Sequence, residues 1–146
     1  MSTIRQLLKD RETYTVDSQQ TVFDVARFMV ERNIGAVPVL DNRGKLVGIF
    51  SERDIMKRVL VEGKDPKKAK VSDVMTPDPL VVTADESFEN CMLLMKQHGF
   101  RHLPIMDEHK LLGLVSLRDL LLHEVDEKDG EVRMMRAYMH SNPGET

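Results

Sequence analysis

The sequence of 146 residues lacks most of what stabilises secreted and membrane proteins: it has one cysteine, no tryptophan and no long apolar run. With Cys91 alone, no disulfide can form within the chain, as is typical of proteins from a reducing compartment. No apolar segment approaches the roughly 20 residues that a membrane-spanning helix requires, and residues 4–11 are too polar for a secretory signal. These absences predict a cytoplasmic protein that does not associate with membranes.

The sequence also lacks a large excess of either positive or negative charge. The net charge is -3 and the isoelectric point is about 6.0, so the chain has no overall electrostatic attraction to nucleic acid. The only basic run, at positions 64–70, is typical of a solvated linker. Apolar residues make up 41% of the chain and ten of them are methionine, which predicts a core of aliphatic and thioether side chains.

An internal repeat organises the residues that are present. The segment Gly-Ile-Phe-Ser-Glu-Arg-Asp at positions 48–54 returns as Gly-Leu-Val-Ser-Leu-Arg-Asp at positions 113–119. Ahead of it, Ala-Val-Pro-Val-Leu-Asp at 36–41 matches His-Leu-Pro-Ile-Met-Asp at 102–107, with a one-residue difference in spacing that falls in a turn at 42–44. Because insertions are tolerated in turns, we expect the two copies to share one fold.

Each copy predicts the element order β-α-β-β-α. Apolar residues at helical spacing follow the capping residues Thr21 and Ser87, and Gly35 and Gly99 stand where a left-handed C-cap favours glycine. Two apolar runs around a turn then predict a hairpin, after which a serine begins a second helix. The expected elements are extended segments 14–16 and 80–83, strands 36–40, 46–50, 102–106 and 111–115, and second helices 52–61 and 117–125.

A half of this size buries little apolar surface alone, so we expect the copies to pack sheet to sheet. We divide the chain into repeat 1 with an N-terminal helix at 4–8 (residues 1–62), a linker in which Ser72 caps a short turn at 73–75 (residues 63–79), repeat 2 (residues 80–126), and a C-terminal helix and tail (residues 127–146). Val132, Met135 and Met139 share one face of this last helix, which favours a dimer or core contact.

The motif Gly-h-x-Ser-x-x-Asp, in which h is apolar, follows a strand and opens a helix in both copies. Ser51 and Ser116 stand at helix N-termini, where free N–H groups and the helix dipole favour an anion. Asp54 and Asp119 lie one turn further on, toward the same side, and a carboxylate can accept two hydrogen bonds from a ribose diol. The two serines can also serve as helix caps without any ligand, and an acidic residue in the first turn is compatible with the helix dipole, so both interpretations stay open.

These repeats resemble CBS domains, and the pair resembles a Bateman module. The resemblance covers residues 3–125 and rests on the helix–hairpin–helix order, on Pro38 and Pro104 in the hairpin strands, and on the two Gly-h-x-Ser-x-x-Asp segments. It implies an α+β fold of two β-α-β-β-α halves related by a pseudo-twofold axis, with two clefts between the sheets. Members of this family bind AMP, ADP, ATP, S-adenosylmethionine or NAD(H) in these clefts, and the pairs commonly form homodimers.

The resemblance implies a role for each matching position. The motif aspartates would bind ribose hydroxyls, and the motif serines would contact ribose or phosphate. Backbone groups around the strand prolines would contact adenine, and these positions are Gly35, Ala36, Val37 and Pro38 in repeat 1 and Arg101, His102, Leu103 and Pro104 in repeat 2. Val16 in one copy, and Val82 and Thr83 in the other, would close over the base from the opposite side. Arg53, Arg101 and Arg118 would either contact phosphate or remain exposed surface charges.

The two clefts are expected to differ, because Gly35-Ala36 is small and uncharged whereas Arg101-His102 is bulky and basic. The Arg101-His102 side suits a phosphate-rich ligand. Both clefts need not be occupied.

Catalytic patterns are incomplete throughout the sequence. His123-Glu124 begins a string like that of zinc proteases, but Glu127 stands where the second histidine belongs. The histidines lack the paired spacing of a metal site, and Cys91 lies on an apolar helical stripe that indicates a core position. We therefore expect no enzyme.

The favoured interpretation is a non-catalytic sensor that binds AMP, ADP, ATP or NAD(H) and acts on a separate, unidentified target protein. It requires no metal, except for Mg²⁺ that accompanies ATP, and it is expected to form a homodimer. The alternative is a structural dimerisation module with no bound nucleotide.

Overall fold

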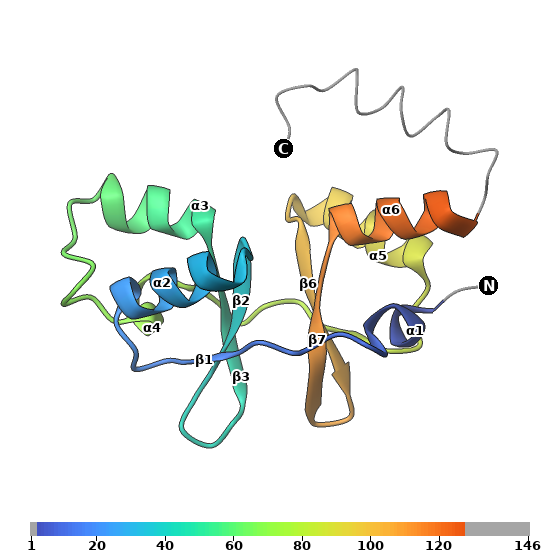
Figure 1. Cartoon of the computed structure of the whole chain (residues 1–146), viewed down its shortest axis with the longest axis horizontal. Helices are drawn as coiled ribbons and strands as arrows, with labels where there is room; N and C mark the ends of the chain where they lie inside the picture. The colour runs from blue at the N-terminus through green and yellow to red at the C-terminus, as the bar shows by residue number, and fades with distance from the viewer. Residues whose placement is uncertain (1–2, 128–146) are drawn as a thin grey trace.

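The computed structural model describes residues 3–127 and has two lobes, each built around one copy of the repeat (Figure 1). The C-terminal helix predicted from Val132, Met135 and Met139 lies outside the described residues. In chain order the elements are α1 (Ile4–Leu8), β1 (Val16–Asp17), α2 (Val22–Arg32), β2 (Ala36–Leu40), β3 (Leu46–Ser51), α3 (Glu52–Asp54), the π-helix η1 (Ile55–Leu60), α4 (Val71–Val74), β4 (Thr76–Pro77), β5 (Val82–Thr83), α5 (Phe88–His98), β6 (His102–Asp107), β7 (Lys110–Ser116) and α6 (Leu117–Glu127).

Each lobe has a mixed sheet, and this confirms the α+β class and the β-α-β-β-α order. In the first lobe the strand order is β1-β2-β3-β4, and in the second it is β5-β6-β7. The short strands β1 and β5 pair in parallel with β2 and β6, with Val16 opposite Val39 and Val82 opposite Ile105. The hairpins β2–β3 and β6–β7 are antiparallel, and β2 contacts β7 between the lobes. The two sheets therefore face one another.

The first helix of each repeat begins and ends as its residues dictate. The side chains of Thr21 and Ser87 accept hydrogen bonds from the backbone N–H groups of Asp24 and Asn90, so both predicted N-caps are confirmed. Gly99 is the left-handed C-cap of α5 at φ 74°. In repeat 1 this prediction was wrong for Gly35, because Asn33 takes the left-handed position at φ 53°. Asparagine tolerates this conformation since its short polar side chain can bond to the nearby backbone.

The second helices differ between the repeats. α6 is a regular α-helix, whereas α3 changes after one turn into the π-helix η1. The linker also differs from expectation: α4 starts at Val71, so Ser72 lies inside the helix and does not cap it, and Lys70 at the N-cap makes no side-chain capping bond. The following residues form the short strand β4 against β3, which the sequence did not predict.

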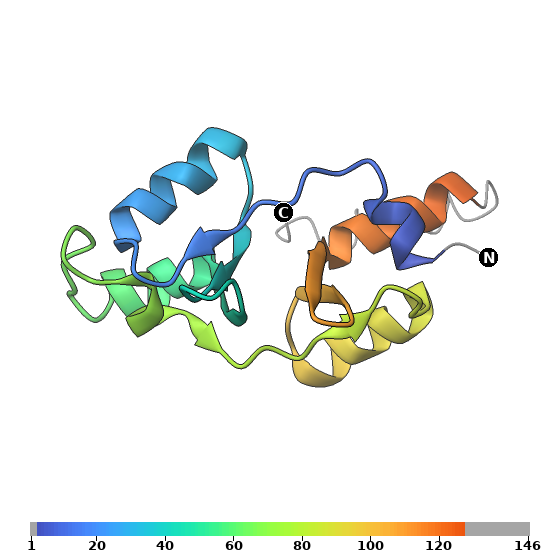
Figure 2. The ribbon, with the colours of Figure 1, turned by 90° about the horizontal axis from the view of Figure 1, so that it is seen from below.

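Each lobe is completed by the short helix that precedes the other repeat. Ile4 and Leu8 of α1 are buried in the core of repeat 2, and Val71 and Val74 of α4 are buried in the core of repeat 1. The N-terminal helix, which precedes repeat 1 in sequence, therefore packs on repeat 2 in space, and the short helix within residues 63–79 packs on repeat 1. The chain consequently crosses between the lobes twice, at opposite edges (Figure 2).

Equivalent backbone bonds hold the two exchanged helices. Arg5 N–H donates to the Ala84 carbonyl at 3.0 Å, and Ser72 N–H donates to the Ser18 carbonyl at 3.1 Å. These pairs occupy matching positions in the two lobes, as a pseudo-twofold arrangement requires. Within residues 3–127 no helix has the length and apolar character to cross a membrane.

Candidate functional site

A cleft of about 520 Å³ lies between the lobes, beside the segment that runs from α1 to β1. Residues of both repeats and of that crossing segment form its walls. The lining residues are Asn33, Ile34, Gly35, Ala36 and Pro38 from repeat 1; His102, Gly113, Leu114, Ser116, Arg118 and Asp119 from repeat 2; and Leu8, Arg11, Glu12, Thr13 and Tyr14 from α1 and the crossing segment. The cleft thus joins the start of the first hairpin to the start of α6.

Seven residues singled out from the sequence lie together in this cleft: Gly35, Ala36, Pro38, His102, Ser116, Arg118 and Asp119. The others lie elsewhere. The two cores bury Val16, Val37, Val82 and Leu103. Pro104 is also buried, whereas the side chains of Thr83, Arg53 and Arg101 are exposed. The first motif, described below, contains Ser51 and Asp54. The resemblance implied that Val16 would close over the base, but the cleft is lined instead by Glu12, Thr13 and Tyr14, which precede Val16 in the chain.

The second motif opens into the cleft. Ser116 N–H donates to Asp119 Oδ2 at 2.9 Å, and Asp119 N–H donates to Ser116 Oγ at 3.0 Å. Arg11 contacts both carboxylate oxygens, with Nη1 at 2.9 Å from Oδ2 and Nη2 at 3.1 Å from Oδ1. The Asp119 side chain is 25% exposed. Burial opposes its ionisation, but the hydrogen bonds from Arg11 and Ser116 outweigh burial and lower the pKa of Asp119.

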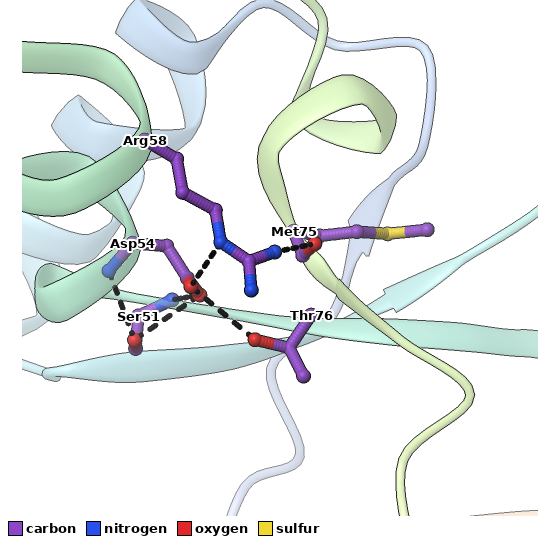
Figure 3. A network of polar contacts seen from close by, with 5 residues as sticks. All are labelled: Ser51, Asp54, Arg58, Met75 and Thr76. Carbon is purple, nitrogen blue, oxygen red and sulfur yellow. Dashed lines mark hydrogen bonds and ion pairs between the residues drawn. The ribbon is translucent and has the colours of Figure 1, made fainter. Parts of the chain in front are cut away.

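The first motif is closed by its own lobe (Figure 3). Ser51 N–H and Ser51 Oγ donate to Asp54 Oδ2 at 3.0 and 3.2 Å, and Thr76 Oγ1 donates to Oδ1 at 3.2 Å. Arg58 Nε lies 3.8 Å from the same Oδ1, while its Nη1 donates to the Met75 carbonyl at 2.6 Å. Asp54 is only 7% exposed. Both of its oxygens are therefore satisfied by the chain itself, and β4 covers them.

Sequence reasoning missed the crossing segment, which supplies one wall of the cleft. Thr13 Oγ1 donates to the Leu112 carbonyl of β7 at 2.7 Å and fixes this segment against repeat 2. No local pattern around Arg11 points to a site, because its place depends on α1 packing on the distant repeat. The internal match of residues 4–8 with 71–75, each an apolar short helix ahead of a repeat, is the signal that could have revealed the exchange.

His102 faces the cleft at the position that Ala36 holds in repeat 1. Burial is the main influence and lowers the pKa of His102; Asp119 acts in the opposite direction and Arg101 adds to the lowering. The imidazole is therefore neutral near pH 7 and can act as a hydrogen-bonding group without a charge.

A second hollow, of about 490 Å³, adjoins the outer side of the crossing segment. Its aromatic wall is already occupied, because the Arg32 guanidinium lies 3.7 Å from the centre of the Phe28 ring. None of the residues singled out from the sequence lines it. We therefore take the cleft between the repeats as the candidate site.

Other chemistry that the sequence raised finds no support in residues 3–127. No three His, Cys, Asp or Glu side chains in this range are placed to hold a metal ion. Cys91 is fully buried, and burial raises the pKa of its thiol to about 11. A thiol of that pKa is protonated at neutral pH and packs as an apolar side chain.

Comparison with known proteins agrees with the repeat structure. The CBS domain profile matches the chain twice, over residues 4–61 and 71–126. The mitochondrial CBS domain-containing protein CBSX3 of Arabidopsis thaliana is 31% identical to this chain. The match covers 84% of this chain and 61% of the length of CBSX3. The CBS-domain containing protein ATU1752 from Agrobacterium tumefaciens is 30% identical, with a TM-score of 0.78 over 84% of this chain and 99% of that one.

A more distant structure carries ligands. The CBS domain pair of MJ0100, solved in complex with 5'-methylthioadenosine and S-adenosyl-L-methionine, has a TM-score of 0.78 over 88% of this chain and 99% of that one. Its identity is 23%, so the likeness establishes a shared fold.

Proposed function

This chain belongs to the CBS-domain family, and from that premise we propose that it is a non-catalytic regulatory module that binds an adenine nucleotide between its repeats. The observation that carries the proposal is the cleft itself, in which the Ser116–Asp119 motif of one repeat faces the Gly35–Ala36 backbone of the other. Its volume of about 520 Å³ lies in the range of small-molecule sites, roughly 300–1,000 Å³.

The lining chemistry fits the three parts of a nucleotide. Ile34, Ala36 and Leu114 offer apolar contact for a base. Asp119 can accept hydrogen bonds from both hydroxyls of a ribose. Arg118 and the N-terminus of α6 favour phosphate, the arginine by its charge and the helix by the positive end of its dipole. The ligands of the MJ0100 pair, both of which contain adenosine, support the choice of an adenine ligand for this fold.

The ligand class remains AMP, ADP, ATP or NAD(H), with Mg²⁺ only as the companion of ATP. Because a ligand in the cleft would contact both lobes, it would stabilise one packing of the two repeats. A target protein that prefers this packing would then respond to ligand concentration by linkage. The module therefore serves as a sensor, and the reduced, buried Cys91 suits a cytoplasmic setting.

A homodimer is part of this proposal. Large apolar side chains are exposed on η1 of repeat 1 and at its C-cap, where Met56, Leu60 and Val61 are 58%, 74% and 75% exposed. Such a patch is typical of an interaction surface. Sedimentation of the full chain should give the dimer mass, and Leu60→Glu should shift the equilibrium toward the monomer.

One observation favours a second candidate, a structural pair with no nucleotide. Arg11 already satisfies Asp119, just as Thr76 and Arg58 satisfy Asp54, so both motifs could serve only as caps. Under this alternative, added nucleotide would leave the melting temperature unchanged.

Thermal shift with AMP, ADP, ATP, NAD, NADH and S-adenosylmethionine tests the choice. At least one of these should raise the melting temperature by mass action, and Asp119→Ala should weaken its binding by about 10- to 100-fold, the equivalent of a lost charged hydrogen-bond set. Asp24→Ala is the matched control, because Asp24 also lies in a first helical turn but pairs only with exposed Arg27. Phosphate release during incubation with ATP would contradict the non-catalytic assignment.

A further inference from the structure

Arg11 occupies the place in the cleft that the proposed function gives to a ribose. Its two terminal nitrogens donate to the two oxygens of Asp119 at 2.9 and 3.1 Å. A vicinal diol would use the same pattern, with two donors to one carboxylate. A ribose can therefore bind Asp119 only after the Arg11 guanidinium has moved away.

The guanidinium can move without unfolding the segment that carries it. The Arg11 side chain is 40% exposed and that of Asp119 is 25% exposed, and ion pairs with such exposure add little to stability. The backbone is fixed independently of this pair, because Arg11 N–H donates to the Leu8 carbonyl at 3.1 Å and Thr13 Oγ1 donates to the Leu112 carbonyl at 2.7 Å. The displaced side chain consequently stays beside the cleft.

A displaced Arg11 is free to pair with a new anionic group. Asp10 and Glu12 flank it in the chain, and Glu12 already accepts a hydrogen bond from the Tyr14 hydroxyl at 3.1 Å. A phosphate attached to the bound ribose would offer the paired acceptors that match a guanidinium. Together with Arg118, which also lines the cleft, Arg11 would then place two cations around the phosphate.

We propose that Arg11 is the residue that selects phosphorylated adenine ligands over adenosine. The proposal rests on the proposed function, in which Asp119 binds the ribose. A nucleotide replaces the carboxylate partner of Arg11 with a phosphate partner, so the charge of Arg11 stays paired. Adenosine also displaces Arg11, but it has no phosphate to pair with the guanidinium.

Calorimetric titration of the full chain with AMP and with adenosine tests this role. Wild type should bind AMP at least about tenfold more tightly than adenosine. Arg11→Gln should bind adenosine about two- to fivefold more tightly than wild type, because Asp119 is free of the competing ion pair, and AMP about tenfold more weakly. The preference for AMP should therefore nearly disappear.

Arg5→Gln is the matched control. Arg5 lies on α1, the short helix that precedes Arg11, and pairs with Asp85 and Asp107 at 3.6 and 3.4 Å, and it does not line the cleft. This variant should keep the wild-type preference. Arg11→Lys keeps the charge without the paired contact, so it should retain part of the preference while binding adenosine better than wild type, and it serves as the test should Arg11→Gln not fold.

The outcomes separate this inference from the proposed function. If both ligands bind and the AMP-to-adenosine ratio is the same in wild type and in the Arg11 variants, Arg11 does not select phosphate, and the proposed function stands. If neither ligand binds wild type or any Arg11 variant, the role of Arg11 fails; the proposed function fails with it only if ADP, ATP, NAD, NADH and S-adenosylmethionine also leave the melting temperature of wild type unchanged.

Discussion

The two copies of the Ser-x-x-Asp motif share a sequence and a capping geometry, yet they have opposite surroundings. The Asp54 side chain is 9% exposed and is held by Ser51, Thr76 and Arg58. The Asp119 side chain is 25% exposed, lines the cleft, and has Arg11 as its added partner. A motif that recurs in sequence therefore need not recur in function.

The difference comes from residues outside the motif. Thr76 follows α4 and Arg11 follows α1, the two helices that the lobes exchange. The short Thr76 side chain on β4 closes over Asp54, whereas the long Arg11 side chain, which is 40% exposed, contacts Asp119. At the position of Arg58, repeat 2 has His123, whose ring packs edge-on against Phe88 at 4.7 Å between centroids. The segments that cross between lobes thus decide which carboxylate is covered and which lines the cleft.

The largest difference between the copies should appear when each aspartate is removed. Asp54→Ala should lower the free energy of unfolding by about 3 kcal/mol, since it removes a helix cap and leaves Arg58 and Thr76 without their buried acceptor. Asp119→Ala should lower it by only about 1 kcal/mol, the value of a cap and an exposed ion pair. Urea denaturation of the two variants measures both values.

The exposed Asp24→Ala provides the baseline for this pair, and its effect should stay within about 0.5 kcal/mol. A larger loss for Asp119→Ala than for Asp54→Ala would reverse the assignment of the closed and open motifs.

The motif glycines should show the next largest contrast. A Cβ on Gly48 would collide with the Met75 side chain and lie 2.9 Å from the Thr76 carbonyl oxygen, which is held in β4. On Gly113 the nearest atom would be the end of the Leu8 side chain at 3.1 Å, which can rotate. We expect Gly48→Ala to destabilise the fold by about 2 kcal/mol and Gly113→Ala by about 1 kcal/mol or less. A lower melting temperature for Gly113→Ala than for Gly48→Ala would contradict this order, and it would show that β4 shifts to accommodate a methyl group more easily than α1 does.

Much of the fold could be predicted from the sequence, because each pattern of apolar spacing and helix capping occurs at equivalent positions in both copies of the repeat. The hairpins, the caps Thr21 and Ser87, and the helix starts after Ser51 and Ser116 follow from apolar spacing and capping chemistry. The exchange of α1 and α4 could not be predicted in the same way. It depends on which lobe leaves an uncovered apolar face, and a contact between distant segments leaves no local pattern.

The candidate site was predictable only in part for the same reason. Ser116, Asp119 and the Gly35–Ala36 turn carry a recognisable motif, and they meet in the cleft. The ribose role that the resemblance implies for Asp54 stays a prediction, and the motif alone does not reveal its closure, since that requires Thr76 from beyond the repeat. Arg11 and Thr13 were missed because their place depends on the crossing of the chain rather than on their neighbours in sequence.

The smallest expected contrast concerns pH. The pKa of His102 is lowered by burial, so just below the ordinary value of 6.5 the unfolded chain binds more protons than the folded chain. Stability should therefore fall as the pH drops through 6.5 toward that lowered pKa. Urea midpoints at pH 7.5 and 5.5 should differ less in His102→Gln than in wild type, whereas the exposed His109→Gln should leave the difference unchanged. Ala36 has no such group, so the effect belongs to repeat 2 alone.

The number of nucleotides bound per chain tests the unequal roles of the two motifs most directly. Calorimetric titration of the wild-type chain with AMP should reach saturation at one nucleotide per chain, because Asp119 lines the cleft and Asp54 does not. Saturation at two equivalent sites per chain would mean that Asp54 also opens to ligand, and it would contradict the assignment of that motif to structure alone.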